Sequence, residues 1–475
     1  MESFNPAAFA GTLALLGIVI LLAGALSGML DRWGVPQVAL FLALGTLLGP
    51  FGLGLISFPL DSAMLGGVAT LSLVLVLFTD AVSVDRAQLR QHLKLALVVL
   101  GPGTVLTTLL ITLAARALLS VSWPAAFILG AALASTDPVM MRGLLRRRGV
   151  PASARYALGL ESGLNDVVVL PIVLVAMAIL AAQGVESDGL SPLGPVALNV
   201  FLLGPAAGAL VGFLSVRGMV LVRRHFGMRR DYESLYVLAV AFTAFAAAEF
   251  LHASGFMAVF TAGLVITFLD VELCDCFHDY GEATSEMLLL FAFVAFGSTL
   301  IWTGLEVVSV RALLFALVGL GARTVVLLAA LARAGLDRQS YWTIVLFGPR
   351  ALSSLLLVLL PVFAGLPEGR ALFPYAALTV LLSVVVHGAV LFGLRGREPS
   401  PAGSDQGAIR LSLAEVSELQ RQGEPVRLLD VRTERGWQLA DTMARGAVRV
   451  DPTRPVESAA EQALPKHDWL VAYCA

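Results

Sequence analysis

Long apolar segments follow one another through the first 396 residues of the chain, separated by short polar stretches. A helix needs about 20 mostly apolar residues to cross the hydrocarbon core of a bilayer, so each segment predicts a membrane span. The pattern therefore predicts an all-α polytopic membrane protein of about 13 transmembrane helices. The expected spans lie near 8–30, 36–56, 63–79, 93–118, 124–145, 156–183, 193–221, 234–251, 254–269, 285–303, 311–333, 341–363 and 372–394.

The composition favours the same class of protein. The chain is 58% hydrophobic and 14% charged, with a mean hydropathy of +0.85. Soluble globular proteins carry roughly 25% charged residues, and a large soluble protein with an unusually apolar core does not explain so many long apolar runs. The formal net charge of -2 gives no indication of a nucleic-acid partner. The expected surroundings are membrane lipid.

The basic residues between the spans predict the orientation of the chain, because cytoplasmic loops of membrane proteins carry an excess of Lys and Arg. With the N-terminus outside, the outer loops hold little beyond Arg311 and Arg370. We therefore expect a multi-pass protein of the bacterial inner (plasma) membrane, with its N-terminus outside and its C-terminus cytoplasmic. The basic residues expected on the cytoplasmic side are Arg32, Arg86, Arg90, Lys94, Arg142, Arg146, Arg147, Arg148, Arg155, Arg217, Arg223, Arg224, Arg229, Arg230, Arg333, Arg338, Arg395 and Arg397.

An odd number of spans fits two inverted halves joined by a linking helix. Inverted repeats with broken helices near the middle of the membrane are a common plan of secondary transporters. The first six spans would then mirror the last six, with the span near 193–221 between them. The change in composition after the last span predicts three regions: a membrane domain at 1–396, a polar linker at 397–406, and a region of soluble character at 407–475.

Ionisable groups inside apolar spans mark candidate functional sites, because burying them in a membrane is costly. In ALASTDPVMMRG (132–143), Asp137 stands directly before Pro138. Proline removes a backbone donor and disfavours helix at the residue before it, so the helix should break near Thr136 and Asp137. Such a break exposes carbonyl and amide groups that bind ions. The alternative is a simple proline kink with an interfacial capping Asp.

A second polar group lies in LGLESGLNDVVVLP (158–171). Glu161 and Asn165 are four residues apart, as are Ser162 and Asp166, so both pairs lie along one side of a helix. A polar stripe in a span faces protein or water rather than lipid. An interhelical hydrogen-bond network without a transport role is the alternative interpretation.

The matching positive charge is Arg350, which follows a Gly-Pro pair in LFGPRALSSLLLVLLP (346–361). An unpaired buried Arg is very costly, so we expect it to pair with Glu161 and to leave Asp166 as the free carboxylate. The alternative is that Arg350 extends to an interface.

Three further charged residues are lesser candidates. Asp80 ends the third span and either reaches the site or caps the helix at the interface. Glu249 is expected to be interfacial. Arg323 is expected to pair or to extend to an interface, without a transport role.

Taken together, TDP, ESxxND and the late Arg resemble the NhaP-like members of the monovalent cation:proton antiporter-1 family, as does SGFMAVFTAGLVI (254–266). The resemblance covers about 1–396. It implies a 13-span fold with a core and a dimerisation domain, a homodimer, and exchange by an elevator-like movement of the core. It implies no cofactor: the ligands are transported Na⁺ (or Li⁺ or K⁺) and H⁺.

The resemblance also implies roles for individual residues. Asp166 resembles the family's essential cation and proton carboxylate. Ser162 and Thr136 resemble the residues that bind Na⁺ beside it, and Asp80 resembles an acidic helper on the third span.

Other positions resemble structural residues of that family. Asp137 and Asn165 resemble the residues that stabilise the crossed, broken helices, and Glu161 and Arg350 resemble its structural ion pair. The family's Arg usually has Gly on both sides, whereas Pro and Ala flank Arg350 in this chain.

The tail carries a second resemblance. VRLLDVRTERGWQLADTMARGAVRVDP (426–452) and DWLVAYCA (468–475) are similar to the first part of a rhodanese domain, an α/β fold. Cys474 would begin the active-site loop, and the chain stops one residue later. We expect this cysteine to be vestigial and the protein to be a transporter rather than an enzyme.

The expected mechanism follows from one carboxylate that holds either a cation or a proton. Alternating access turns that competition into coupled exchange. Because Asn165 stands where a second carboxylate would otherwise be, we expect electroneutral 1:1 exchange. The rival interpretations are a passive cation channel or uniporter, a sulfur-linked anion transporter, and a redox protein acting through Cys474. The sequence does not distinguish Na⁺ from Li⁺ or K⁺.

Overall fold

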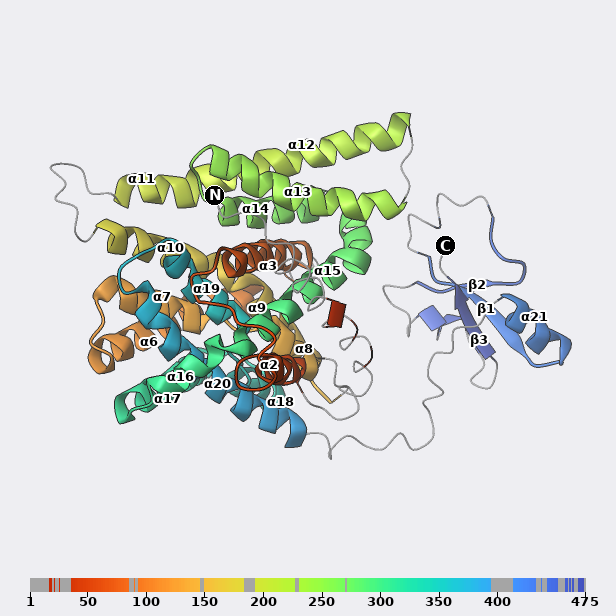
Figure 1. Cartoon of the computed structure of the whole chain (residues 1–475). Helices are drawn as coiled ribbons and strands as arrows, with labels where there is room; N and C mark the ends of the chain where they lie inside the picture. The colour runs from red at the N-terminus through yellow and green to blue at the C-terminus, as the bar shows by residue number, and fades with distance from the viewer. Residues whose placement is uncertain are drawn as a thin grey trace. The chain divides into compact units, whose positions relative to one another are not determined.

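The chain divides into two compact units, Met1–Glu398 and Pro399–Ala475 (Figure 1). The computed structural model describes residues 36–84, 93–145, 149–182, 193–226, 230–269, 271–393, 413–432, 442–451 and 469–473, with a few single residues between them. The first unit is helical throughout its described elements, and the second holds a small sheet. Most of the span expected near 8–30 lies outside the described residues, as does Cys474.

The first unit is built from apolar helices, several of them interrupted. The elements of its first half are α2 (Gln37–Leu48), α3 (Ala63–Val82), α5 (Leu93–Val98), the π-helix η1 (Val99–Gly103), α6 (Thr104–Leu118), α7 (Trp123–Ala134), α8 (Pro138–Leu145), α9 (Ala152–Leu164) and α10 (Asp166–Ala182). The remaining elements are α11 (Leu193–Leu198), the π-helix η2 (Asn199–Leu203), α12 (Gly204–His225), α13 (Arg230–Phe250), α14 (Gly255–Leu269), α15 (Val271–Ser298), the short 3₁₀ turn η3 (Leu300–Trp302), α16 (Thr303–Glu306), α17 (Val310–Ala330), α18 (Arg338–Leu346), α19 (Leu352–Phe363) and α20 (Gly369–Gly393).

Eight helical stretches of the described residues are long and apolar enough to cross a membrane. A ninth is a pair, Met287–Ser298 and Leu300–Glu306, that bends by 53° at its junction. Three shorter apolar helices, α2, α14 and α19, complete the set. The expected all-α polytopic architecture is confirmed. Every expected span from residue 36 onward overlaps one of these helices, while the total of 13 stays a prediction.

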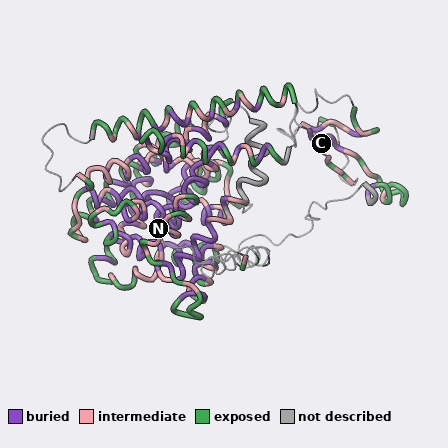
Figure 2. The backbone as a smooth tube through the Cα atoms, turned by 45° about the horizontal axis from the view of Figure 1, so that its top comes forward, coloured by how far each residue is buried: buried purple, intermediate pink, exposed green. Residues whose placement is uncertain are grey.

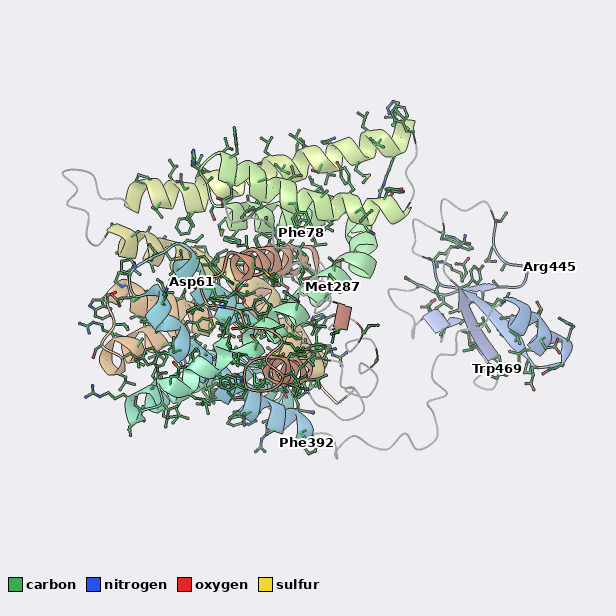
Figure 3. The ribbon with its side chains drawn as sticks, in the orientation of Figure 1. Asp61, Phe78, Met287, Phe392, Arg445 and Trp469 are labelled. Carbon is green, nitrogen blue, oxygen red and sulfur yellow. The ribbon has the colours of Figure 1, made fainter. Side chains whose placement is uncertain are left out.

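Helices α12, α13 and α14 form a layer beside the rest of the unit (Figure 1). Phe78 of α3 lies at the boundary of this layer, where it is fully buried in one apolar cluster with residues of all three helices (Figure 3). Within the layer, α12 and α14 pack closely at Gly208, where an added Cβ would lie 2.0 Å from the carbonyl oxygen of Ala258. Small residues allow membrane helices such closeness.

Burial is high in α7, in α19 and in residues 289–298 of α15. By contrast, α12, the long helix at the edge of the unit, exposes much of its length (Figure 2). The main apolar cluster includes fully buried segments such as 128–133 of α7 and 355–359 of α19. These two helices contact each other through the middle of the unit, and each adjoins an interruption of its span. The interruptions therefore lie among buried side chains.

The second unit contains α21 (Leu413–Arg421) and a three-stranded parallel sheet. Its strands are β1 (Val426–Asp430), β2 (Val448–Arg449) and β3 (Trp469–Tyr473), in the order β2-β1-β3. Val426 of β1 pairs with Trp469 of β3, and Leu429 pairs with Val448 of β2. A helix with a parallel sheet agrees with an α/β fragment, and its assignment to the rhodanese family stays a prediction.

Asp430 ends β1 and is buried under three hydrogen-bonding groups. The Arg432 side chain donates to both carboxylate oxygens and the Arg432 amide donates to Oδ1, while the Tyr473 hydroxyl donates to Oδ2 at 2.9 Å. These bonds, above all those from the Arg432 side chain, lower the pKa of Asp430 to about 2. The ionised carboxylate thus fastens β3 to the end of β1.

Candidate ion-binding site

Two interrupted spans meet inside the first unit. One break separates α7 from α8 at residues 135–137, and the other separates α18 from α19 at residues 347–351. The amide of Asp137 donates to the carbonyl oxygen of Pro349 at 3.0 Å. The Ser354 hydroxyl donates to the carbonyl oxygen of Ser135 at 3.4 Å. The two breaks therefore contact each other directly, as expected for crossed, broken helices.

Asp137 caps two half-helices at once. Its Oδ1 accepts from the amide of Met140 in α8, and its Oδ2 accepts from the amide of Leu352 at the start of α19, both at 2.9 Å. The first amides of a helix have no partner within the helix and carry partial positive charge, so a carboxylate satisfies them well. Asp137 therefore links the starts of α8 and α19, and its role in stabilising the crossing stays a prediction.

Arginines lie at the opposite, carbonyl ends of the interrupted helices. The Arg350 Nη1 donates to the carbonyl oxygen of Ala134, the last residue of α7, at 2.6 Å. The Arg323 Nη1 donates to the carbonyl oxygen of Ile344 near the end of α18 at 2.8 Å. Positive charge is favourable at a helix C-terminus. Each of the four half-helix ends at the crossing therefore faces a side chain of opposite charge.

The expected ion pair between Glu161 and Arg350 is wrong: Glu161 pairs with Arg323 of α17. The Arg323 Nε and Nη2 donate to the two oxygens of Glu161, each at 2.5 Å, and both side chains are buried. The physical reason is that the Ala134 carbonyl engages Arg350, while α17 brings Arg323 to Glu161. Gly348 makes room for this pair, because an added Cβ there would lie 2.7 Å from Cδ of Arg323.

Asp166 is the first residue of α10, and 3% of it is exposed. Its Oδ1 accepts from the hydroxyl of Ser135 at 2.9 Å. The neighbouring Asn165 donates through Nδ2 to the Thr136 hydroxyl at 2.9 Å and to the Thr136 carbonyl oxygen at 3.4 Å. The Asn-Asp pair is therefore docked on the break between α7 and α8.

Oxygen atoms without a hydrogen-bond partner lie near this carboxylate. In the described part of the chain, Asn165 Oδ1 and Asp80 Oδ2 are buried and accept no hydrogen bond. Asp80 lies near the end of α3, where its carbonyl oxygen would be 3.9 Å from a Cβ added to Gly163, three residues before Asp166. Buried polar atoms are normally satisfied, so unpaired oxygens here are candidates for ion or water ligands. Among the described residues there is no cluster of His, Cys, Asp and Glu suited to a resident metal.

The other two predicted ligands, Thr136 and Ser162, do not bond to Asp166 in this structure. Thr136 uses its hydroxyl to hold Asn165, and Ser162 donates to the carbonyl oxygen of Gly159 in its own helix at 3.2 Å. The sequence interpretation missed Ser135 and gave Arg323 no partner. The STDP sequence offered a signal for Ser135, since it adjoins the predicted break, whereas no spacing linked Arg323 to a residue 162 positions away.

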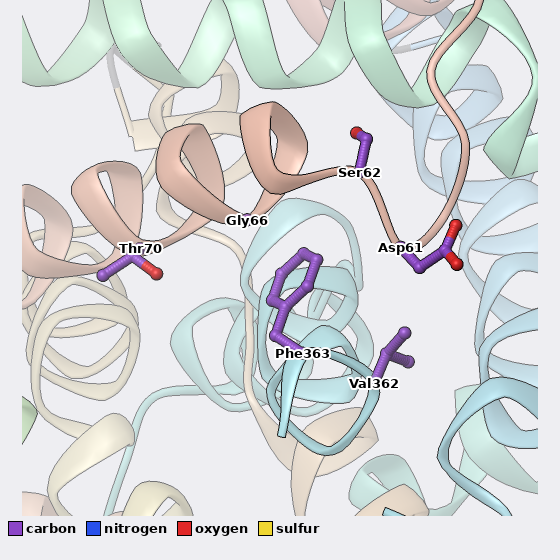
Figure 4. A pocket seen from close by; sticks show the side chains of 6 residues that line it. All are labelled: Asp61, Ser62, Gly66, Thr70, Val362 and Phe363. Carbon is purple, nitrogen blue, oxygen red and sulfur yellow. The ribbon is translucent and has the colours of Figure 1, made fainter. Parts of the chain in front are cut away.

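A cavity of about 330 Å³ lies where α3 begins and α19 ends (Figure 4). It is lined by Asp61, Ser62, Gly66, Thr70, Val362 and Phe363. Beside it, Asp61 forms an exposed ion pair with Arg370 of α20 at 2.5 Å. Further along α3, Leu73 and Leu77 are buried between this cavity and Asp80. None of the residues that line the cavity bonds to Asp166.

Comparisons with known proteins relate the chain to cation–proton exchangers. The family model described as "Sodium/hydrogen exchanger, transmembrane" matches residues 17–394. The K(+)/H(+) antiporter NhaP of Alkalimonas amylolytica is 26% identical over 419 residues, which cover 86% of this chain and 70% of that protein. The K(+)/H(+) antiporter NhaP2 of Shewanella baltica is 27% identical over 370 residues, which cover 77% of this chain and 63% of that protein.

The fold also matches a solved structure. The sodium proton antiporter MjNhaP1 from Methanocaldococcus jannaschii superposes with a TM-score of 0.65 at 20% sequence identity. The match covers 81% of this chain and 98% of that one. This structural match concerns the fold of the helical unit. The chain spans about two thirds of the length of the curated relatives named above.

Proposed function

Because the chain belongs to the sodium/hydrogen exchanger family, we propose that it exchanges a monovalent cation for protons across a membrane, with Asp166 as the shared site. Similar proteins are named as antiporters of K⁺ or of sodium with protons. We propose Na⁺ as the cation, with Li⁺ and K⁺ as the alternatives to be tested. No resident cofactor takes part.

The observation that carries this proposal is the setting of Asp166. Its buried carboxylate accepts one hydroxyl, that of Ser135 at the break between α7 and α8, and adjoins Asn165 Oδ1, which accepts no hydrogen bond within the described residues. A cation and a proton cannot occupy the same carboxylate together. Binding of one therefore releases the other, and a protein that opens the site to each side in turn couples their movements.

The charges at the crossing favour one-for-one exchange. Asp137 is committed to two helix ends, and Glu161 is committed to Arg323. Asn165 carries no charge, which leaves Asp166 as the exchanging carboxylate and Asp80 as an acidic helper nearby. We therefore include electroneutral 1:1 exchange in the proposal. Ser162 and Thr136 remain proposed co-ligands only for states in which their present hydrogen bonds open.

A passive channel is the rival function. Channels need a continuous pore with weak binding at several positions. Asp166 is instead almost fully buried, and so are Leu73 and Leu77, which follow the cavity residue Thr70 along α3 before Asp80. These features support an exchanger with alternating access.

The orientation and assembly complete the proposal. We propose a homodimer in the bacterial inner membrane, with the C-terminal end of α12 on the cytoplasmic side. The last turn of that helix carries Arg223, Arg224 and His225, as the excess of positive charge on cytoplasmic faces favours.

The proposal predicts that Asp166→Asn abolishes exchange. In proteoliposomes with an imposed pH gradient, Na⁺, Li⁺ or K⁺ should dissipate the gradient through the wild-type protein and not through this variant. Asp337→Asn is a matched control, because Asp337 caps α18 outside the crossing and Asn caps helices equally well. Normal exchange by Asp166→Asn would refute the assignment, and a rate that depends on membrane potential would refute electroneutrality.

A further inference from the structure

Three hydroxyl groups are candidate cation ligands, those of Ser135, Thr136 and Ser162, and the structure gives each a different partner. Thr136 accepts from Asn165, and Ser162 donates to the carbonyl oxygen of Gly159. Ser135 alone of the three donates to Asp166, at 2.9 Å. Ser135 and Asp166 are both buried, at 0% and 3% exposure, so water does not compete strongly for this bond.

The position of Ser135 is fixed from both broken helices. It is the first residue after α7, with an extended backbone at φ -66° and ψ 133°. Its carbonyl oxygen accepts from Ser354 of α19, and the preceding carbonyl oxygen, of Ala134, accepts from Arg350. The hydroxyl therefore reaches Asp166 from a segment held at two consecutive carbonyls. A preorganised group of this kind loses little freedom when a ligand binds.

We propose that Ser135 is the hydroxyl ligand of the transported cation and the residue that orients Asp166 to receive it. This inference rests on the proposed exchange at Asp166. A serine hydroxyl has one donor and two acceptor lone pairs. When it donates to the ionised carboxylate, both lone pairs stay available to a small monovalent cation bound at the same oxygen.

The same hydroxyl also responds to the proton. Once Asp166 is protonated, its carboxyl group becomes a donor, and Ser135 accepts from it instead of donating. The cation then has no negative charge to bind. The serine lone pair that faced the cation accepts the carboxyl hydrogen instead. Ser135 thus changes its hydrogen-bond direction at each half of the exchange cycle without movement of its backbone.

The test compares Ser135→Ala, Ser135→Thr and Ser135→Cys in the full chain, reconstituted in proteoliposomes and assayed for dissipation of a pH gradient. The Ala variant should raise the half-saturating Na⁺ concentration by about tenfold, since a hydrogen bond to a charged group is worth at least that factor. The pH of half-maximal exchange should also rise, by about one unit, because the ionised carboxylate loses its donor. Ser135→Thr keeps the hydroxyl and should restore both values to within about threefold.

Ser298→Ala is the matched control. Ser298 is equally buried but donates to the carbonyl oxygen of Ala295 within its own helix, α15. Its removal should leave the half-saturating Na⁺ concentration and the pH profile unchanged. If Ser135→Ala fails to fold, Ser135→Cys decides the question, because a thiol of similar size is a weak donor and should behave as Ala does.

A second readout separates ligand binding from transport. Na⁺ should raise the melting temperature of the detergent-solubilised wild-type chain, and Ser135→Ala should need about tenfold more Na⁺ for the same rise. Unchanged Na⁺ and pH dependence in the Ala or Cys variant overturns the role of Ser135, while Asp166→Asn still abolishes exchange. Active Asp166→Asn protein would instead overturn the proposed function itself.

Discussion

At the scale of single residues, the partner of Glu161 is the clearest difference between sequence and structure. Charge type predicted that this buried carboxylate needs an arginine, and that requirement holds. Which arginine pairs with Glu161 depends on how α17 and α18 pack around α9. This packing joins positions far apart in the chain, so the partner could not be predicted from the sequence alone. Asp166, Asn165 and Asp137 could be proposed as site residues from the sequence because they belong to short motifs whose spacing places them on one helix or next to a proline.

The corrected ion pair predicts a specific pattern of stability. Arg323→Leu leaves Glu161 buried without its partner, and breaking a buried pair typically costs about 3–5 kcal/mol. Thermal melting in detergent should show this loss, with Glu161→Gln added to Arg323→Leu recovering part of it. The exposed pair of Asp61 and Arg370 is the control, since Arg370→Ala should cost less than about 1 kcal/mol.

A double-mutant cycle distinguishes the two arginines. Coupling to Glu161 should be large for Arg323 and small for Arg350, because the Arg350 side chain donates to the carbonyl oxygen of Ala134. Strong coupling of Glu161 to Arg350 alone would contradict the pairing seen in the structure.

At the scale of elements, the two interruptions, between α7 and α8 and between α18 and α19, were more predictable than the contact between them. Pro138 and Pro349 mark both breaks in the sequence, because proline disfavours helix at the preceding residue. Their mutual contact was expected from the resemblance to a transporter family rather than from the residues. The double capping by Asp137 depends on the crossing itself, so no local pattern gives it.

Asp137 should therefore stabilise two elements together. A lost N-cap costs about 0.5–2 kcal/mol, so Asp137→Ala, which removes two, should cost about 1–4 kcal/mol. Asp137→Asn retains capping atoms and should cost less. Melting of the detergent-solubilised variants measures both effects, and an Ala variant as stable as the wild type would show that the two amides have other partners.

At the scale of the whole molecule, composition and apolar runs were sufficient to predict a helical membrane unit and a separate polar tail. The close contact of α12 with α14 and the grouping of helices into layers were not predictable, because small residues permit closeness without specifying a partner. The parallel sheet of the second unit agrees with the α/β character expected for the tail.

The tail should respond to acid through Asp430. An Asp in an unfolded chain titrates near pH 3.9, whereas the folded pKa of Asp430 is lowered to about 2 by Arg432, with Tyr473 adding to the effect. The stability that this carboxylate contributes is therefore fully present above about pH 4 and is lost as the pH falls toward 2. Hydrogen exchange at β1 and β3 in the full chain should increase over that range.

Asp430→Asn provides the comparison for the tail. It removes the titrating group, so hydrogen exchange at β1 and β3 should be faster at neutral pH and should lose this part of its acid dependence. Unchanged acid dependence would show that another group controls the stability of the sheet.

The central claim is that one carboxylate binds either a cation or a proton, and its most direct test is the half-saturating Na⁺ concentration measured at several pH values. Competition at Asp166 predicts that this concentration rises about tenfold for each unit of falling pH on the acidic side, while the maximal rate at saturating Na⁺ stays constant. A half-saturating concentration that is independent of pH, together with a falling maximal rate, would contradict a shared site.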